Sequence, residues 1–318
     1  MKDNKKTKGS SNGNRNGTTK DIDWTLSTWN VSTLMRSGAA KELVRELDSY
    51  KSDITAIQEI RWKGNGIRYL SSNNNKADIY YSGTEQADGL YGCGFIVRNK
   101  FRKSVMEWKP INERMCYLRI RGCFYNYSII CVYAPHLKRP DPEKDQFYDQ
   151  LDRLVGSCPK YDAVVILGDF NAKIGSEGGC KGTIGKNSLH RESNDNGTRL
   201  TDFALSRGLV VSSTRFPHKR IHLGTWKIPG SNRANQIDHI LIDARHASCI
   251  LDVRSYRGAN IDSDHYLVKA KVRSRISTVR TTSRVDQKIN IEALKQPNVA
   301  NAFADTISLT KNSPDADE

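Results

Sequence analysis

Short apolar runs dominate the sequence, and they limit the chain to a fold built mainly from strands. Runs of four to nine residues bounded by turn residues are typical of β-strands. They span residues 24–29, 54–57, 93–97, 115–120, 125–133, 163–167, 221–226, 237–242 and 266–272. The longest clean apolar stretch, residues 163–167, is far below the ~20 residues that a membrane-spanning helix needs. We therefore expect no transmembrane segment and no membrane partner.

Helical spacing of apolar residues is confined to three regions. It covers residues 40–47, continues after Asp141 to residue 155, and returns at residues 200–204. Many strands with few helices predict a two-sheet α/β or α+β sandwich flanked by helices.

The charge of the chain is strongly positive, with 50 Lys and Arg against 35 Asp and Glu, or +15. This excess points toward a polyanionic partner. Residues 1–20 carry six basic side chains and one acidic one, and are expected to form a disordered basic arm that contacts phosphate or is simply solvated. Residues 276–318 are expected to form a linker and a helical tail. The folded domain is assigned to residues 21–275, which hold about +11.

The seven cysteines are scattered without a CxxC pair, at positions 93, 116, 123, 131, 158, 180 and 249. Reduced, mostly buried thiols are the expected state, and the spacing implies neither zinc nor disulfides. The first 20 residues lack the apolar core of a secretory signal, which favours an intracellular protein.

Several apolar runs end in a carboxylate or an amide, where layered folds tend to place functional groups. Asn30 and Glu59 close the first two runs, and Asp169 with Asn171 closes the run after residue 163. An extended backbone would aim Asp169 and Asn171 at one face, because they are two residues apart. Gly168 would let the backbone bend or a ligand approach closely.

An Asp and a His from separate strands provide a possible orienter and base. Asp238 starts one apolar run, and Ser263-Asp264-His265 precedes another. Taken singly, each pattern is weak, since an Asp beside a strand is usually part of a turn and a lone His is usually structural. Taken together in this order, the patterns are specific.

The ordered motifs resemble the endonuclease/exonuclease/phosphatase superfamily over about residues 22–275. They are Trp-Asn (29–30), Gln-Glu (58–59), Tyr-Ala-Pro (133–135), Gly-Asp-Phe-Asn (168–171), Ile-Asp-His-Ile (237–240) and Ser-Asp-His (263–265). Two further segments are similar to apurinic-type endonuclease domains of non-LTR retrotransposons, especially the RTE clade. They are Gln-Glu-Ile-Arg-Trp (58–62) and Thr-Trp (225–226) followed by Asn-Gln-Ile-Asp-His-Ile-Leu (235–241). The craniofacial development proteins derived from such an element are similar as well.

The resemblance implies a four-layered α/β sandwich, with two mostly antiparallel sheets packed face to face and flanked by helices, and a site at one end. Glu59 would be the main metal ligand, helped by Asp264 and Asn30. Oxygen ligands of this kind suit Mg²⁺, with Mn²⁺ as a substitute. No tightly bound organic cofactor is expected.

The same resemblance assigns the remaining roles. Asp169 would hold or deprotonate the attacking water, and Asn171 and His265 would bind the scissile phosphate. Asp238 would orient His265, while Tyr133 would stabilise developing charge or, alternatively, serve only as a core residue.

Two positions depart from the family pattern. Ser32 stands where many repair relatives have a second acidic residue, which predicts weaker metal binding. His136 follows Tyr-Ala-Pro where relatives often have Asn, and is a candidate DNA contact.

A basic hairpin tip is predicted at residues 227–236. Lys227, Arg233 and Asn235 are its candidate DNA contacts, and Trp226 at its base either packs or contacts DNA. In retrotransposon endonucleases the matching hairpin helps to choose the nick site. Trp29 and Trp62 are expected to pack in the core.

The leading hypothesis is a Mg²⁺-dependent DNA endonuclease that leaves a 3′-hydroxyl and a 5′-phosphate. In a retroelement, a reverse transcriptase domain encoded elsewhere in the same element would extend that hydroxyl, and the expected location is the nucleus. Residues 303–306 lack the paired aspartates of a polymerase motif. The alternatives are an abasic-site repair endonuclease, a phosphoinositide or sphingomyelin phosphoesterase, and an inactive derivative that only binds nucleic acid.

Overall fold

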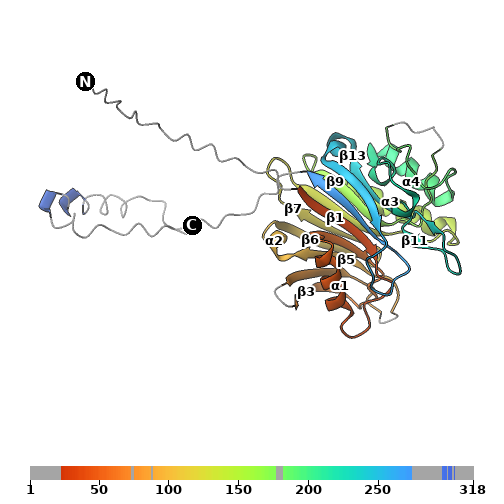
Figure 1. Cartoon of the computed structure of the whole chain (residues 1–318). Coiled ribbons are helices and arrows are strands. Elements are labelled where there is room, and N and C mark those ends of the chain that lie inside the picture. The colour runs from red at the N-terminus through yellow and green to blue at the C-terminus, as the bar shows by residue number, and fades with distance from the viewer. Residues whose placement is uncertain are drawn as a thin grey trace, which may run out of the picture. The chain divides into compact units, whose positions relative to one another are not determined.

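The computed structural model describes residues 23–72, 75–86, 89–176, 182–273, 296–298, 300–302 and 304. The chain divides into two units, residues 1–278 and 279–318, and the first contains both large sheets (Figure 1). The predicted arm at residues 1–20 lies outside the described residues, as does nearly all of the predicted tail at 276–318. The domain bounds therefore stay predictions.

One sheet has seven strands in the order β14-β15-β1-β2-β5-β4-β3. Its first and last strands along the chain, β1 and β15, pair side by side in antiparallel fashion, while β1 and β2 are parallel. The strands are β1 (Asp23–Asn30), β2 (Ile54–Gln58), β3 (Asn65–Ser72), β4 (Asn75–Ser82), β5 (Cys93–Arg98), β14 (Ile250–Tyr256) and β15 (Leu267–Arg273).

The second sheet has six strands in the order β10-β13-β9-β8-β7-β6, with only β8 and β9 parallel. A separate two-stranded hairpin, β11 (Trp226–Lys227) and β12 (Ala234–Asn235), forms where the basic hairpin tip was expected. The six strands are β6 (Val105–Asn112), β7 (Met115–Ile120), β8 (Tyr127–Tyr133), β9 (Ala163–Asp169), β10 (Leu209–Val211) and β13 (Asp238–Asp243).

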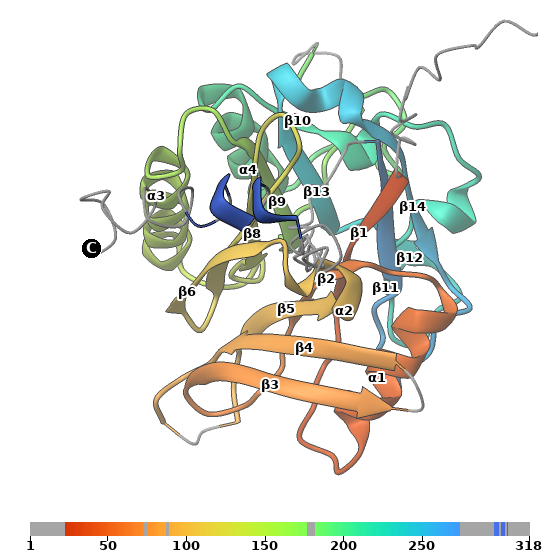
Figure 2. The ribbon, with the colours of Figure 1, turned by 90° about the vertical axis from the view of Figure 1, so that its left-hand side faces the viewer.

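Helices cover the outer face of each sheet. Leu43 and Leu47 of α1 pack on the seven-stranded sheet, whereas Leu151 of α3 and Leu200 of α4 pack on the six-stranded sheet. Figure 2 separates α1 from α3 and α4 on opposite sides of the stacked sheets. The helices are α1 (Ala39–Ser49), α2 (Asn99–Arg102), α3 (Asp141–Gly156) and α4 (Asp195–Ser206), with 3₁₀ turns at Ser212–Thr214, Arg220–His222 and Ala244–Cys249. None of the described helices is long and apolar enough to cross a membrane.

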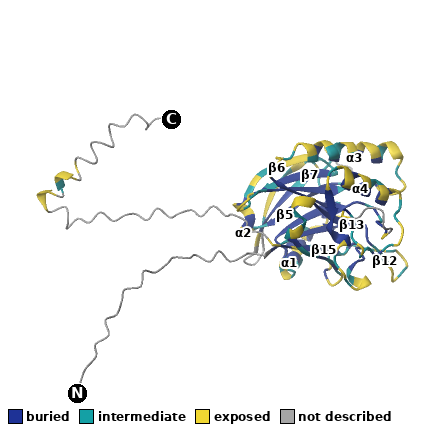
Figure 3. Ribbon diagram, turned by 90° about the horizontal axis from the view of Figure 1, so that it is seen from above, coloured by how far each residue is buried: buried dark blue, intermediate teal, exposed yellow. Residues whose placement is uncertain are grey.

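The main core lies between the two sheets, where inward side chains such as Leu26, Phe95, Leu118 and Ile129 are fully buried. Figure 3 shows buried strands enclosed by helices whose outer surfaces are exposed. Gly168 is required by close strand packing, because a Cβ there would lie 1.9 Å from the Val132 carbonyl oxygen. Gly168 thus allows the backbones of β8 and β9 to lie close together.

The predicted four-layered sandwich is confirmed, and so are eight of the nine strand runs in position. The run at residues 221–226 is wrong. Most of it forms a 3₁₀ turn and an irregular segment, and only Trp226 enters a strand. Leu223 is buried whereas Trp226 is only partly buried, so the apolar residues of this run do not lie on one face of a strand.

Candidate active site

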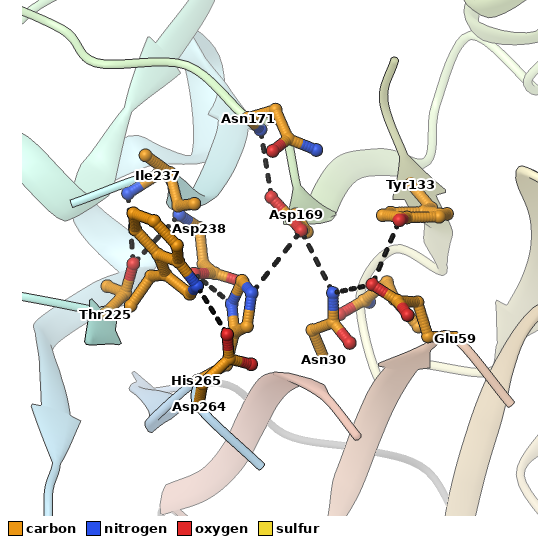
Figure 4. A network of polar contacts seen from close by, with 12 residues as sticks. Asn30, Glu59, Tyr133, Asp169, Asn171, Thr225, Ile237, Asp238, Asp264 and His265 are labelled. Atoms are coloured by element: carbon orange, nitrogen blue, oxygen red, sulfur yellow. Dashed lines mark hydrogen bonds and ion pairs between the residues drawn. The ribbon is translucent and has the colours of Figure 1, made fainter. Parts of the chain in front are cut away.

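Two pairs of parallel strands deliver polar side chains to the same end of the sandwich (Figure 4). Parallel neighbours end at one edge, so the last residues of β1 and β2 lie together, as do those of β8 and β9. Strand β13 runs the other way and begins there, with Asp238 paired opposite Asp169. The residues assembled in this way are Asn30, Glu59, Tyr133, Asp169, Asp238 and His265.

The amide of Asn30 joins the two sheets. Its Nδ2 donates to Glu59 Oε1 at 2.9 Å and to Asp169 Oδ2 at 3.1 Å. The Tyr133 hydroxyl, from the opposite sheet, donates to the same Glu59 oxygen at 2.9 Å. Tyr133 therefore has a polar role in addition to its packing, and Glu59 is held by donors from both sheets.

Asp238, His265 and Asp169 form a buried chain. The Nδ1 of His265 lies 3.1 Å from Asp238 Oδ2, and its Nε2 lies 3.9 Å from Asp169 Oδ2. The exposed fractions are only 1%, 6% and 2%, respectively. Asp238 thus fixes the ring so that its second nitrogen faces Asp169 and the pocket.

Burial and the neighbouring charges tune this chain. Burial opposes the charged form of His265, but the charge and hydrogen bond of Asp238, aided by Asp169, raise its pKa to about 9. Burial, reinforced by the charge of Asp238, raises the pKa of Asp169 to about 7. The imidazole is therefore cationic at neutral pH, while Asp169 titrates where a general base is most effective.

Tyr133 stays a neutral donor. Burial and then the charges of Glu59 and Asp169 raise the pKa of its hydroxyl far above the usual value. The guanidinium of Arg114 supports the residue from behind by donating to its backbone carbonyl at 3.2 Å.

Four residues of the site have left-handed backbone angles, which are costly for residues other than glycine. The φ angles are +57° at Ser32, +56° at Glu59, +61° at Arg61 and +51° at Asn171. Each such residue costs on the order of 1–3 kcal/mol, which the surrounding structure must offset. The expectation that Asn171 extends the strand is wrong, because its backbone turns and its N–H donates to Asp169 Oδ1 at 2.9 Å.

Asn171 is fixed by a residue that the sequence motifs did not reveal. Asn196, on the first turn of α4, donates from Nδ2 to the Asn171 carbonyl and to the Pro135 carbonyl, each at 3.0 Å. The side chain of Asn171 in turn donates to the Ala134 carbonyl at 3.0 Å. Only the helix-start pattern at residues 194–197 could have drawn attention to this position.

Asp264 lies at the edge of the site beside the hairpin. The indole Nε1 of Trp226 donates to its Oδ2 at 2.7 Å, and the Ser32 hydroxyl lies 3.4 Å from its Oδ1. Thr225, which the sequence motifs include without a role, accepts hydrogen bonds from the backbone of Ile237 and Asp238 and so anchors the start of β13. Ser32 therefore contacts a metal-ligand candidate rather than supplying a charge of its own.

An open pocket of about 550 Å³ contains these groups. Glu59, Asp169 and Asp264 line it together with three basic side chains, Arg61, Lys138 and Lys173. The pocket is thus an acidic centre with basic residues around it, an arrangement that suits a phosphodiester held near a cation.

The predicted DNA-contact residues divide into two groups. Trp226, Asn235 and His136 line the pocket, whereas Lys227 and Arg233 are exposed on the hairpin. Trp29 and Trp62 pack as expected, and the indole of Trp29 also donates to the His265 carbonyl at 3.0 Å.

The donor atoms at the site fit a hard divalent cation. Glu59, Asn30 and Asp264 offer carboxylate and amide oxygens, the ligands that Mg²⁺ and Mn²⁺ prefer. The Oε2 of Glu59 is bound by Arg61 at 2.8 Å, so Arg61 and a cation would compete for it. Asp169, Asp238 and His265 also have ligand atoms within 4.8 Å of one another.

Residues 27–265 match the sequence model of the Endonuclease/Exonuclease/phosphatase family. Craniofacial development protein 2 of Bos taurus is 32% identical over 270 residues, which is 85% of this chain. The same protein of Tragulus javanicus is 32% identical over 262 residues, or 82% of the chain. The chain spans only 44% of the length of these relatives.

Solved structures share the fold. The endonuclease domain of TRAS1, a telomere-specific non-LTR retrotransposon, aligns with a TM-score of 0.54 at 16% identity, covering 80% of this chain and 99% of that one. The catalytic domain of Xenopus laevis APE2 aligns with a TM-score of 0.59 at 20% identity, covering 80% and 94%.

Proposed function

Because the chain belongs to the Endonuclease/Exonuclease/phosphatase family, as its motifs predicted, we propose that it is a Mg²⁺-dependent endonuclease that nicks one DNA strand. The products would be a 3′-hydroxyl and a 5′-phosphate. The observation that carries the proposal is the bridge from Glu59 through Asn30 to Asp169 and His265, set in a pocket with basic residues around it.

The residues divide the work between cation, phosphate and water. Glu59, Asn30 and Asp264 would hold the cation, which when bound polarises the phosphodiester and stabilises the leaving 3′ oxygen. Cationic His265, oriented by Asp238, would bind a non-bridging phosphate oxygen.

We assign the attacking water to the side of the phosphate opposite the leaving 3′ oxygen. Asp169 would accept its proton, because its pKa of about 7 matches neutral conditions. Asn171 would help to position the phosphate with its remaining amide hydrogen, and the neutral Tyr133 hydroxyl would stabilise developing negative charge.

We further propose that the substrate is DNA at a retrotransposon target site. The family, the TRAS1-like fold and the basic pocket rim support this proposal. The exposed Lys227 and Arg233 and the pocket residues His136, Trp226 and Asn235 would contact the strand. A reverse transcriptase domain encoded elsewhere in the element would extend the 3′-hydroxyl, and the location that we propose is the nucleus.

The direct test is nicking of supercoiled plasmid with Mg²⁺ and with EDTA. We expect Mg²⁺-dependent open circles that a polymerase can extend. Glu59→Ala and His265→Ala should each lower the rate at least ~100-fold, since each removes a group that acts on the reacting phosphate.

Glu107→Ala is the matched control, because Glu107 is a partly exposed carboxylate on the edge strand β6, paired with Lys109. It should nick at the wild-type rate. Full activity in Glu59→Ala or His265→Ala would overturn the site assignment. Hydrolysis of phosphoinositide or sphingomyelin vesicles at a rate comparable with DNA nicking would overturn the substrate class, and tight DNA binding without any nicking would favour a binding derivative.

An abasic-site endonuclease is the second candidate. Leu137, Ile237 and Trp226 line the same pocket beside His265 and provide apolar surface for an extruded sugar. A duplex with one abasic site, compared with the matched intact duplex, separates the two functions. Cleavage only at the lesion would favour repair, and equal cleavage would favour target-site nicking.

A further inference from the structure

Three cysteine side chains meet in the core between the sheets, close below Glu59. Cys93 comes from β5, and Cys116 and Cys131 pair opposite each other on β7 and β8. Their Sγ atoms all lie within 4.8 Å of one another, and all three residues are fully buried. The sequence spacing gave no sign of this cluster, because the two sheets must pack before the sulfurs meet.

We propose that these sulfurs form a site for one soft divalent cation of the Zn²⁺ or Cd²⁺ class, distinct from the Mg²⁺ site. Zinc binds thiolate sulfur at about 2.3 Å, so three sulfurs around one ion lie about 4 Å apart. The sulfurs of the cluster lie within 4.8 Å of one another, so small side-chain adjustments would bring them to this spacing. An all-sulfur trio selects soft cations over Mg²⁺, which prefers oxygen.

Gln58 supplies a fourth donor. Its Nε2 lies 3.2 Å from Cys131 Sγ, and its two amide atoms lie 3.1 and 3.2 Å from the Thr28 hydroxyl. That hydroxyl can pair with either orientation of the amide, since it both donates and accepts. Rotation of the amide therefore presents Oε1 to the ion and completes a four-coordinate set.

Without the ion, the cluster is tolerated as mostly neutral thiols. Burial raises the pKa of Cys93 and Cys116 well above the usual range. Burial acts in the same direction on Cys131, but hydrogen bonds from Cys116, Cys93 and Gln58 outweigh it and lower its pKa. When the ion binds, each neutral thiol releases its proton to solvent as its sulfur–metal bond forms, and no redox change is needed.

The cluster is linked to the active site through short stretches of chain. Gln58 precedes Glu59, Cys131 lies two residues before Tyr133, and Cys116 lies two residues after Arg114, which binds the Tyr133 carbonyl. A bound ion would tie both sheets together directly beneath these residues. Because the site is buried, loading is expected to accompany folding and to raise thermal stability.

The test uses the full chain, refolded with reductant and one equivalent of Cd²⁺ and then passed through gel filtration. We expect one retained Cd²⁺ per chain, a thiolate-to-cadmium charge-transfer band and a higher melting temperature. Cys93→Ser, Cys116→Ser and Cys131→Ser should each lower retention at least tenfold. Cys123→Ser, at an exposed cysteine, is the matched control and should retain Cd²⁺ like the wild type.

Two further measurements keep the test decisive if a cysteine variant does not fold. Native mass spectrometry of the wild type should show one Cd²⁺ with the loss of two or three protons. Glu59→Ala should keep the ion, which separates this site from the proposed nuclease centre. Absence of the band in the wild type, retention in all three cysteine variants, loss in Glu59→Ala, or a disulfide in place of the ion would each overturn the proposal.

Discussion

Buried carboxylates occupy both ends of the strands, but their partners differ. At the end away from the pocket, Asp162 accepts two hydrogen bonds from Arg119 at 2.8 and 3.0 Å, and Asp53 pairs with Lys100 at 2.6 Å. At the pocket end, Asp169 is equally buried but meets an amide, a backbone N–H and the imidazole of His265.

The difference teaches that the partner, rather than burial, decides what a buried acid does. A guanidinium that is always charged neutralises its carboxylate permanently and makes it structural. Amides and a titratable imidazole leave the negative charge available to a cation, a proton or a phosphate. Because Asp162 and Asp169 are buried to the same extent, the same substitution, Asp to Asn, can be made at both ends and its effects compared.

The largest expected effect is on catalysis at the pocket end. Asp169→Asn should lower the nicking rate about 10³-fold, the scale for loss of a general base. The free energy of unfolding should change little, because the substitution removes a buried charge without leaving an unpaired arginine. Rates from plasmid nicking and stabilities from urea unfolding give both values; a large loss of stability with normal rate would remove the contrast.

The next effect is on stability at the opposite end. Asp162→Asn should lower the free energy of unfolding by about 3 kcal/mol, because Arg119 would lose its partner. The nicking rate of the folded variant should equal that of the wild type. Urea unfolding and plasmid nicking, both performed at a temperature where the variant is folded, would contradict the comparison if the rate fell as it does in Asp169→Asn.

A pH effect of about 2 kcal/mol is expected from His265 at the pocket end. The pKa of His265 is raised to about 9 in the folded protein, so its stabilising contribution is present below about pH 6.5 and is lost as the pH rises through 9. Asp169 is largely ionised throughout this upper range. Unfolding in EDTA at pH 7.5 and 9.5 should reveal a loss in the wild type that is about 2 kcal/mol smaller in His265→Ala. The buried thiols of Cys93 and Cys116, whose pKa is also raised, add the same loss in both proteins. An equal loss in the two proteins would assign the effect elsewhere.

The smallest expected effect concerns Arg61. It binds Glu59 at the pocket end through a guanidinium, as Arg119 binds Asp162 at the opposite end. Its bond to Glu59 Oε2 is partly exposed, so the pair is worth at most about 1 kcal/mol. Arg61→Ala should therefore lower the Mg²⁺ concentration for half-maximal nicking about fivefold. Arg153→Ala, at an exposed arginine in the last turn of α3, is the control. Mn²⁺ binding followed by electron paramagnetic resonance should shift in parallel, and weaker binding would mean that Arg61 supports the cation.

The sequence predicted the pocket end better than the opposite end. Carboxylates and amides that follow apolar runs, such as Asp169, belong to ordered motifs, whereas an Asp that precedes a run, such as Asp162, resembles an ordinary turn residue. Asn196 was missed, and Thr225 was noted without a role, because each acts on the backbone of another residue. That role depends on tertiary contacts, which a single sequence does not record.

The fold was predictable to the extent that strands are buried on both faces. Strands β2 and β9 are continuous apolar runs and were found, whereas β3, β4 and β6 alternate with polar residues near a sheet edge and were not. The left-handed turn at Asn171 was also unforeseen, because Asn is one of the few residues that tolerate either conformation.

The pairing of β1 with β15 makes the seven-stranded sheet depend on two strands that lie far apart in the sequence. One edge of β1 pairs only with β15, which is synthesised much later, and β15 pairs with β14 on its other side. A chain that lacks β1 loses an interior strand of the seven-stranded sheet together with Asn30, and a chain that lacks β15 loses the interior strand that follows His265. Loss of either strand should therefore disrupt both the seven-stranded sheet and the pocket at its end.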